Sequence, residues 1–512
     1  MKKQAMIMVA VLSMLTACNK DNITTVTPDS STDYSDVEFT GEIDIVYSAS
    51  GSATVSGAGI DQTVSISGNG VTIVNAGSEL VQYNVSGTTS NGYLKIYSAS
   101  GQAIVLNSAS ITNPNGAAIN VQGSQSSPSD GAVTYLVLNG SSALADGSSY
   151  SNTPDNEDEK GVVFGEGSFS ISGSGSLTVT ATGKSGIVSD DNVTINEGTI
   201  AITASASTFV SNGDTTKVAG LKAKDAFLIN GGSLTIVSSG TGGKGMSGDG
   251  TATFAGGTVR ITVSGSNFGS SSGGGGGWGG GGGWGGQSSN NSVAAKGIKF
   301  DGNLTFSGGT VIVTCGNHEG IESKGEISIT GGHVYSKSSD DAINSSSTMT
   351  VSGGYVCAYS TGNDGLDANG NLYIKGGVVY AIGTSSPEVA IDANTEGGYK
   401  LYVQGGTLIA IGGLESGSSL TQSCYSTSSW SRSTWYSMTV GSNTYAFQTP
   451  ASGGNTLVVS GAQQPTLKSG VSASGGTEYF EGMLLVEPTV SGGSSVNLSS
   501  YSGGNGGGWG GH

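Results

Sequence analysis

Short runs of alternating apolar and polar residues follow one another along most of the chain. Leu304–Phe306, Ile327–Ile329 and Met349–Val351 each carry an apolar residue at both ends and a polar residue between them. A period of two is that of a β-strand with one buried face. Amphipathic helical periodicity of useful length is missing from the sequence, so the pattern predicts an all-β protein.

Pairs of glycines separate these strands at a nearly constant interval. The intervals are 25, 52, 23, 22, 23 and 29 residues, between pairs that begin at Gly231, Gly256, Gly308, Gly331, Gly353, Gly376 and Gly405. A period of 22 or 23 residues indicates a repeat architecture. The interval of 52 residues contains an inserted loop as well as one ordinary repeat. Leucine-rich repeats have a similar period, but their Leu-x-x-Leu-x-Leu pattern is missing here.

Each repeat has the same internal order. A Gly-aliphatic or Ala-aliphatic pair comes first, then a short strand, the Gly-Gly turn and a second strand. Glycine tolerates the positive φ of sharp corners, so three short strands can close one coil. A single coil cannot bury its inward side chains, but coils stacked about 4.8 Å apart can.

One inward position is aliphatic in every coil, which predicts a continuous ladder. Its members are Leu234, Val259, Val311, Val334, Val356, Val379 and Leu408. The sequence therefore predicts a right-handed parallel β-helix with coils of 22–23 residues. A β-sandwich is disfavoured because regular two-residue Asn-Gly turns are missing.

The repeat sets the expected domain organisation. We assign residues 42–415 to the β-helix, with a Gly/Trp-rich insertion at 269–292. Residues 416–512 break the period, and we expect a β-rich cap over the open end of the helix, followed by a Gly-rich tail.

The first residues predict export and lipidation. Lys2 and Lys3 precede an apolar run too short for a permanent membrane span, and Leu15–Cys18 resembles a lipobox. We therefore expect a signal peptide at 1–18, acylation of Cys18, and a polar tether at 19–41. This predicts a lipoprotein of the outer membrane, on the surface of a Gram-negative bacterium. An ordinary secretory signal is the alternative.

Net charge limits the possible binding partners, and cysteine content limits the possible disulfide bonds. The net charge of −18 opposes binding to nucleic acid, and it opposes acidic polysaccharides unless a cation bridges them. The cysteines after Cys18 are Cys315, Cys357 and Cys424, an odd number that argues against a disulfide framework. We expect them to be small, half-buried packing residues.

Four ordered motifs carry a family resemblance. They are Ala295-Lys296-Gly297-Ile298-Lys299, Gly320-Ile321-Glu322-Ser323-Lys324-Gly325, Asp340-Asp341-Ala342-Ile343-Asn344 and Asn363-Asp364-Gly365-Leu366-Asp367-Ala368. Over roughly residues 70–415 the chain resembles bacterial carbohydrate-binding-domain lipoproteins with a pectate-lyase-like β-helix. The resemblance implies binding of cellulose or polygalacturonate, and of calcium. The earlier Gly186-Ile187-Val188 and Gly220-Leu221-Lys222 lack acidic partners, which puts calcium sites there in doubt.

The residues around the Gly-aliphatic pair predict a corner rich in oxygen ligands. This acidic corner consists of Glu319, Glu322, Asp340, Asp341, Asn344, Asp364, Asp367 and Asp392. Carboxylates stacked about 4.8 Å apart repel each other by roughly 1 kcal/mol in water and by more when partly buried. Ca²⁺ would offset this, since it takes six to eight oxygen ligands. The alternative is turn capping, with Lys296 and Lys299 pairing with Glu319 and Glu322.

Tyrosines offer a surface for sugars. Tyr335, Tyr359 and Tyr380 occupy strand positions that we expect to face solvent, where an apolar ring with a polar tip suits an extended polysaccharide. Ordinary cross-strand packing is the alternative reading of the same residues.

These features together favour calcium-dependent, non-catalytic binding of polysaccharide, either pectin-like or cellulose-like. A calcium-dependent polysaccharide lyase is the second hypothesis. Its base would be Lys296, Lys299 or Lys324, because Arg260 and Arg432 are the only arginines and neither lies among clustered acids. A surface adhesin or structural protein is the third. The sequence leaves the oligomeric state open.

Overall fold

The computed structural model describes residues 32–151, 153–154, 157–211, 213–269 and 292–503. The expected signal peptide, Cys18, most of the tether, most of the Gly/Trp-rich insertion and the end of the tail lie outside these residues. Within them, no helix is long and apolar enough to cross a membrane. The only helical element there is the 3-10 turn η1 (Tyr34–Asp36).

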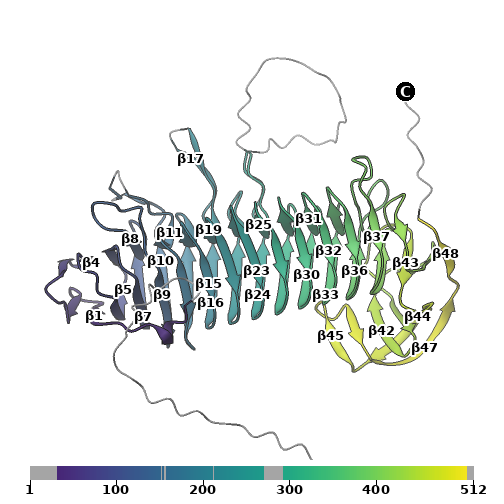
Figure 1. Cartoon of the computed structure of the whole chain (residues 1–512), viewed down its shortest axis with the longest axis horizontal. Coiled ribbons are helices and arrows are strands. Elements are labelled where there is room, and N and C mark those ends of the chain that lie inside the picture. The colour runs from purple at the N-terminus through teal and green to yellow at the C-terminus, as the bar shows by residue number, and fades with distance from the viewer. Residues whose placement is uncertain (1–31, 152, 155–156, 212, 270–291, 504–512) are drawn as a thin grey trace, which may run out of the picture.

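Three strands build one coil of the chain. In one such coil these are β25 (Ile298–Phe300), β26 (Leu304–Phe306) and β27 (Thr310–Cys315). Each strand pairs in parallel with its counterpart one coil further on, as β25 does with β28 (Ile321–Ser323). The coils are stacked along the long axis of the molecule, from purple to green in Figure 1. The chain is therefore all-β, with parallel strands in large sheets.

The first face of the stack is a twelve-stranded sheet, parallel apart from its first pair. Its order is β3 (Gln62–Ser67), β4 (Asn69–Asn75), β6 (Gly92–Ser98), β8 (Ile119–Gln122), β11 (Gly161–Gly165), β14 (Ser185–Ser189), β19 (Ala219–Ala223), β22 (Lys244–Gly248), β25, β28, β31 (Ile343–Ser345) and β34 (Leu366–Ala368).

Two further rows of strands complete the coils. One row runs through β1 (Gly41–Tyr47), β5 (Val81–Thr89), β7 (Gln102–Asn113), β9 (Thr134–Asn139), β12 (Phe169–Ser172), β15 (Val193–Ile195), β20 (Ala226–Ile229), β23 (Thr251–Phe254), β26, β29 (Ile327–Ile329), β32 (Met349–Val351), β35 (Leu372–Ile374), β37 (Leu401–Val403) and β39 (Ser419–Leu420). The other runs through β10 (Ser141–Asp146), β13 (Ser176–Ala181), β16 (Thr199–Ala204), β21 (Ser233–Ser238), β24 (Thr258–Val263), β27, β30 (His333–Ser338), β33 (Tyr355–Ser360), β36 (Val378–Ile382) and β38 (Thr407–Ile411).

The aliphatic ladder holds the coils together as the sequence predicts. Leu234, Val259, Val311, Val334, Val356, Val379 and Leu408 pair in unbroken register, and all are buried. The strand β24 pairs directly with β27, so the interval of 52 residues is one coil with an insertion. The second glycine of each turn has positive φ, for example +73° at Gly332.

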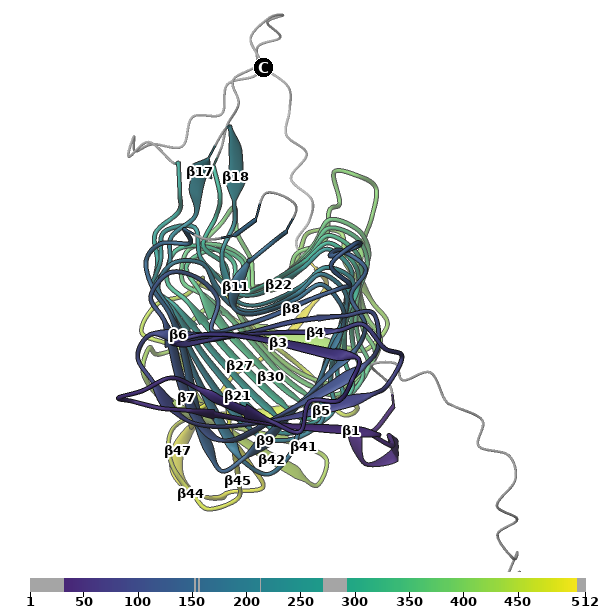
Figure 2. The ribbon, with the colours of Figure 1, turned by 90° about the vertical axis from the view of Figure 1, so that its left-hand side faces the viewer.

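Antiparallel strands occupy both ends of the stack. At the N-terminal end β2 (Thr54–Ser56) pairs with β1, and β3 pairs with β4. At the C-terminal end β43 (Leu457–Ser460) pairs with β38 and with β40 (Cys424–Thr427), which also pairs with β48 (Ser499–Tyr501). A separate hairpin of β17 (Phe209–Ser211) and β18 (Asp214–Thr216) projects from the stack (Figures 1 and 2).

Most of the C-terminal segment lies elsewhere than expected. It forms a six-stranded antiparallel sheet of β45 (Thr477–Tyr479), β46 (Leu484–Val486), β42 (Asn443–Gln448), β41 (Trp435–Val440), β44 (Thr466–Ser474) and β47 (Thr489–Val496). Rather than only covering the open end, this sheet packs against the outer side of the last coils, as the yellow strands below β33 and β36 show in Figure 1. Aromatic residues on β41 and β42, including Tyr436 and Phe447, supply the apolar contact.

The remaining cysteines, Cys315, Cys357 and Cys424, form no disulfide, as predicted, and they are fully buried rather than half-buried.

Candidate functional site

Each coil of the twelve-stranded sheet places one side chain on the outward face, and this side chain is polar in all of these coils except those of Phe164 and Val188. Aliphatic residues such as Leu221, Ile298 and Ile321 point into the core, so the residue after each points outward. The resulting row pairs in register through Thr72, Lys95, Asn120, Phe164, Val188, Lys222, Ser247, Lys299, Glu322, Asn344 and Asp367. It divides into an amide zone, a lysine zone and a carboxylate zone.

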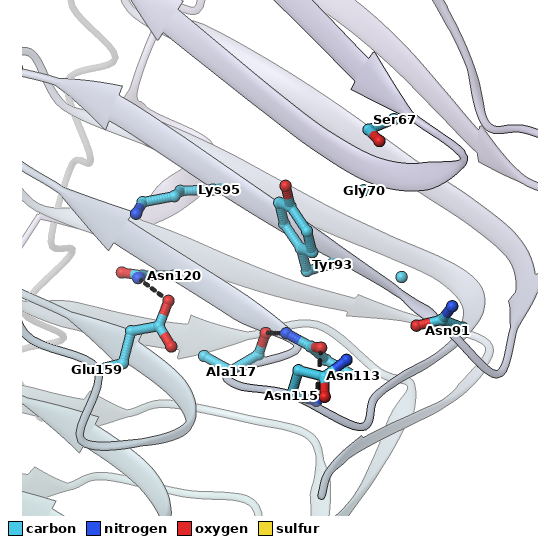
Figure 3. Close-up of a pocket in the computed structure, with 11 residues that line it drawn as sticks. Ser67, Gly70, Asn91, Tyr93, Lys95, Asn113, Asn115, Ala117, Asn120 and Glu159 are labelled. Atoms are coloured by element: carbon cyan, nitrogen blue, oxygen red, sulfur yellow. Dashed lines mark hydrogen bonds between the residues drawn. The ribbon is translucent and has the colours of Figure 1, made fainter. Parts of the chain in front are cut away.

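The amide zone is a cavity of about 310 Å³ over β4, β6 and β8, which we call the amide pocket. In Figure 3 Tyr93 stands in its middle, with Lys95, Asn120 and Glu159 on one side and Asn91 on the other. The lining is Ser67, Gly70, Asn91, Gly92, Tyr93, Lys95, Asn113, Asn115, Ala117, Asn120 and Glu159. Amide side chains both donate and accept hydrogen bonds, as hydroxyl-rich ligands require.

Local packing fixes the tyrosine in the amide pocket. A Cβ atom at Gly70 would lie 2.6 Å from Cε1 of Tyr93, so only glycine lets the ring lie against the neighbouring strand. The backbone oxygen of Tyr93 accepts a hydrogen bond of 2.8 Å from the hydroxyl of Tyr47, which holds the strand in place. The half-buried ring thus lies against Gly70 of the neighbouring strand, beside the amides.

Hydrogen bonds also orient the polar groups of the amide pocket. Nδ2 of Asn120 donates to Oε1 of Glu159 at 2.9 Å, and Nδ2 of Asn113 donates to the oxygen of Ala117 at 2.7 Å. Lys95 pairs with Glu157. Burial acts to lower the pKa of Lys95, but its hydrogen bonds with Glu157 and Tyr97 and the charges of these two groups together outweigh burial, and the pKa is raised.

The amide pocket was missed by sequence reasoning, which treated these coils as irregular. The available signal was the density of asparagines at Asn91, Asn113, Asn115 and Asn120, with Asn120 on the same outward row as the acidic residues.

The lysine zone is a second cavity, of about 330 Å³, over β19, β22 and β25, which we call the lysine pocket. Six lysines and three acids line it together with small residues: Lys217, Lys222, Lys244, Lys296, Lys299, Lys324, Asp249, Asp301, Glu322, Ser247, Gly248, Ser292, Val293 and Ala294. Burial, and then the charges of Lys217, Lys299 and other lysines, lower the pKa of Lys244 to about 8.

The first part of the acidic corner is neutralised by lysines. Nζ of Lys296 lies 3.1 Å from Oε2 of Glu319 and 2.5 Å from Oε2 of Glu322, and Lys324 also pairs with Glu322. Burial acts to raise the pKa of Glu322, but these ammonium groups outweigh it and the pKa is lowered. The pairing alternative therefore holds for Lys296, whereas Lys299 pairs with Asp301 instead.

A histidine joins this part of the acidic corner. His318 contacts Glu319, and its Nδ1 lies 3.1 Å from Oδ2 of Asp340. Ligand atoms of these three residues lie within 4.8 Å of one another, the spacing that a metal ion requires. Among the described residues the one other such group is Asp158, Glu166 and Asp190, outside the predicted corner.

The second part of the acidic corner is a group that we call the carboxylate cluster. It consists of Asp341, Asp364, Asp367 and Asp392. Nδ2 of Asn344 donates to Oδ2 of Asp341 at 2.9 Å and to Oδ2 of Asp367 at 2.7 Å. The amide nitrogen of Asn344, rather than the oxygen expected as a ligand, therefore faces the carboxylates. Oδ1 of Asp364 accepts a hydrogen bond from the backbone nitrogen of Val389 at 2.6 Å.

Burial and mutual repulsion strongly raise the pKa values of the carboxylate cluster. Burial, and next the charge of Asp367, raise the pKa of Asp341 to about 7. Burial, with repulsion from Asp340 and Glu388, raises the pKa of Asp367 to about 6. The pKa values of Asp364 and Asp392 are raised by burial and by neighbouring carboxyl groups as well. At neutral pH Asp364 and Asp392 hold protons and Asp341 is partly protonated unless a cation compensates their charge, whereas Asp367 is mostly ionised.

The predicted sugar-binding tyrosines are not accessible, and this expectation was wrong. Tyr335, Tyr359 and Tyr380 expose 5%, 8% and 0% of their surface. The six-stranded C-terminal sheet covers them, and the hydroxyl of Tyr380 donates to the backbone oxygen of Gln448 at 2.8 Å. These residues point away from the core of the coils, as expected, but they form the interface with the C-terminal sheet.

Comparison with known proteins places the chain in a family. A polysaccharide lyase-like protein from C. thermocellum, solved as a gadolinium derivative, matches 71% of this chain and 94% of its own at 16% identity, with a TM-score of 0.32. Comparison with curated proteins gave no match. The family described as carbohydrate-binding domain-containing protein matches residues 67–342, more than half of the 512 residues and a range that includes the amide and lysine pockets. The chain belongs to this carbohydrate-binding domain-containing family.

Proposed function

We propose that the chain is a non-catalytic binding protein for an extended polysaccharide, which lies along the outward face of the twelve-stranded sheet. The amide pocket carries the proposal. It combines a half-buried aromatic ring, several amides, a lysine and a glutamate in an open cavity, the mixture of apolar and convergent polar groups typical of ligand sites. Pectin-like and cellulose-like chains are the candidate ligands.

The proposed scaffold is a right-handed parallel β-helix. Successive parallel strands in each row are joined by a full coil, and such connections are right-handed in about 98% of proteins. A long, regular sheet with one outward residue per coil suits a ligand that is itself a linear polymer.

Replacement of Tyr93 by alanine tests the binding site. The variant removes the ring that we expect to contact a sugar face, which costs about 1–2 kcal/mol and therefore about tenfold or more in affinity. The measurement is retention of the soluble chain from residue 19 on a panel of immobilised polysaccharides. The control is Tyr399→Ala, which removes a tyrosine that is 44% exposed outside the pocket. Equal retention of both variants and the unmodified protein would remove the amide pocket from the proposal.

We also propose that Ca²⁺ binds at the carboxylate cluster. Four carboxyl groups with raised pKa values, two of them buried and two half-buried, support this, because an oxygen-seeking divalent cation would take the place of their protons. Thermal unfolding in calcium and in chelator tests it. We expect a higher melting temperature in calcium, and a smaller difference for Asp367→Asn. The same melting temperature in both buffers would exclude the site.

The same samples distinguish a lyase, which cleaves the polysaccharide, from a protein that only binds it. β-Elimination leaves an unsaturated sugar end that absorbs ultraviolet light, whereas binding alone leaves the spectrum unchanged. Steady growth of this absorbance with an acidic polysaccharide would overturn the non-catalytic proposal.

For the location of the protein, we propose a surface lipoprotein of the outer membrane, anchored through acylated Cys18. Labelling of the full-length chain with a radioactive fatty acid, lost in Cys18→Ser, is the expected result. Protease accessibility on intact cells then distinguishes the two faces of the outer membrane.

A further inference from the structure

The lysine pocket contains cations without partners. Lys244 exposes only 6% of its surface, and no ion pair or hydrogen bond of its ammonium group occurs among the described residues. Lys217, which is exposed, and Lys222, which is half-buried, also form no ion pair or hydrogen bond through their ammonium groups within that part of the chain. An ammonium group on a buried side chain, without a counter-ion and repelled by neighbouring lysines, is costly, so native proteins pair such groups or fill the site with a ligand.

The coil register brings these lysines together. Lys244 pairs with Ala219 on the preceding coil, and its neighbour Gly245 donates to the backbone oxygen of Lys296 on the next. On the adjacent outward row Ser247 lies between Lys222 and Lys299. The short serine leaves space between two long side chains and adds a hydroxyl group, so the centre of the pocket is open and surrounded by donors.

The charge of the lysine pocket is opposite to that of the protein. Six of the 19 basic residues line this one cavity, against three of the 37 acidic residues, in a chain of net charge −18. Of the three acids, Glu322 is engaged by Lys296 and Lys324, and Asp301 by Lys299, while the charge of Asp249 acts on Lys222. Asp249 offsets only part of the positive charge of Lys217, Lys222 and Lys244, so the remaining positive potential is left for a ligand from outside the chain.

We propose that the lysine pocket is an oxyanion site that binds a negatively charged substituent, carboxylate or sulfate, of a glycan. Ammonium groups and a hydroxyl are hydrogen-bond donors suited to such oxygens. The site needs no bridging cation, so it offers an acidic glycan a direct contact despite the negative charge of the whole chain. The glycan part of this inference rests on the proposed function, whereas oxyanion binding itself does not.

Binding of defined oligosaccharides in chelator tests the site. The probes are a galacturonate trisaccharide, a sulfated disaccharide, the neutral counterpart of each, and inorganic sulfate. The unmodified protein is expected to prefer one or both anionic probes, and the preferred probe identifies the substituent. Lys244→Met and Lys222→Met are each expected to lose at least tenfold in affinity for it. Lys468→Met, an exposed lysine of the C-terminal sheet, is the matched control and should retain wild-type affinity.

Thermal unfolding of Lys244→Met supplies a measurement independent of the glycan. Removal of an unpaired charge that neighbouring lysines repel is expected to raise the melting temperature without ligand, while stabilisation by inorganic sulfate disappears. Wild-type affinity for anionic probes in both pocket variants, or no preference for anionic over neutral probes, would overturn the oxyanion site. Retention of neutral polysaccharide that depends on Tyr93 would then leave the proposed function standing. Stabilisation by sulfate that depends on Lys244, without binding of any glycan, would support the oxyanion site and overturn the polysaccharide function.

Discussion

At the scale of single residues, the side chains outside the core matter more for function than those inside it. The ladder residues are aliphatic side chains that can replace one another. Lys244 and Asp364, by contrast, have environments that disfavour their charged forms, and Tyr93 places an aromatic ring in a polar pocket. Perturbed titratable groups gather at functional sites for this reason.

The carboxylate cluster predicts an inverted dependence of stability on pH. In chelator, the raised pKa values mean that the folded chain holds protons that the unfolded chain releases above its ordinary carboxyl pKa. Stability is therefore expected to fall as pH rises from about 5 to 8, through the values of about 6 and 7 for Asp367 and Asp341. The melting temperature, measured across this range, checks the sign.

Calcium should oppose this trend. A bound cation favours the ionised carboxylates, so the stabilisation by calcium is expected to be larger at pH 8 than at pH 5. A melting temperature in chelator that rises between pH 5 and 8 would show that the folded structure does not raise the pKa values of the carboxylate cluster.

At the scale of elements, the Gly-Gly turn is the unit that repeats most faithfully. A Cβ atom at Gly332 would lie 2.5 Å from the oxygen of Gly308 in the preceding coil, and φ is +73°. Each turn thus rests directly on the backbone of the one before it, which only glycine permits.

Gly332→Ala tests this close stacking. A positive φ alone costs an alanine about 1–2 kcal/mol, and the clash with Gly308 adds to it. We expect a loss of more than 2 kcal/mol, roughly twice that of the control Gly398→Ala, which has φ of +86° but no atom within 4 Å of its Cβ. Hydrogen exchange of the amides in β30 measures the local effect. Similar losses in the two variants would mean that crowding contributes little.

Sequence reasoning succeeded for elements whose cause is local and periodic. The register from Leu234 to Leu408 could be predicted because each coil buries the same position, and the acidic row followed from the same alignment. The prediction of exposed tyrosines failed because strand periodicity shows that Tyr380 points outward but not what covers it. The amide pocket was missed because its coils lack the Gly-Gly spacing that revealed the others.

At the scale of the whole molecule, contacts are nearly confined to neighbouring coils, except where the C-terminal sheet returns onto the stack. Phe447 is fully buried there, with ring centroids 5.6 Å from both Tyr380 and Tyr436. Arg260 of β24 adds a contact with a residue far away in the sequence, since its guanidinium lies 2.5 Å from the carboxylate of Glu481.

Phe447→Ala is expected to loosen the C-terminal sheet without disturbing the first coils. Truncation of a buried phenylalanine costs about 3–5 kcal/mol, and in repeat structures such a loss stays near its origin. Limited proteolysis should then cut within residues 428–496 at higher rates, while retention through Tyr93 stays unchanged. Loss of that retention would show that the two ends of the molecule are coupled.

Because the coils keep a uniform register, successive residues of the outward row are separated by a constant distance. Each coil advances the row by about 4.8 Å, so the amide pocket, the lysine pocket and the carboxylate cluster lie at set intervals that no side-chain motion can alter. Duplication or loss of one coil between two Gly-Gly turns would leave every pocket intact and change only the distance between them. Members of this fold could thus acquire preference for differently spaced charges on a polymer through changes in coil number alone.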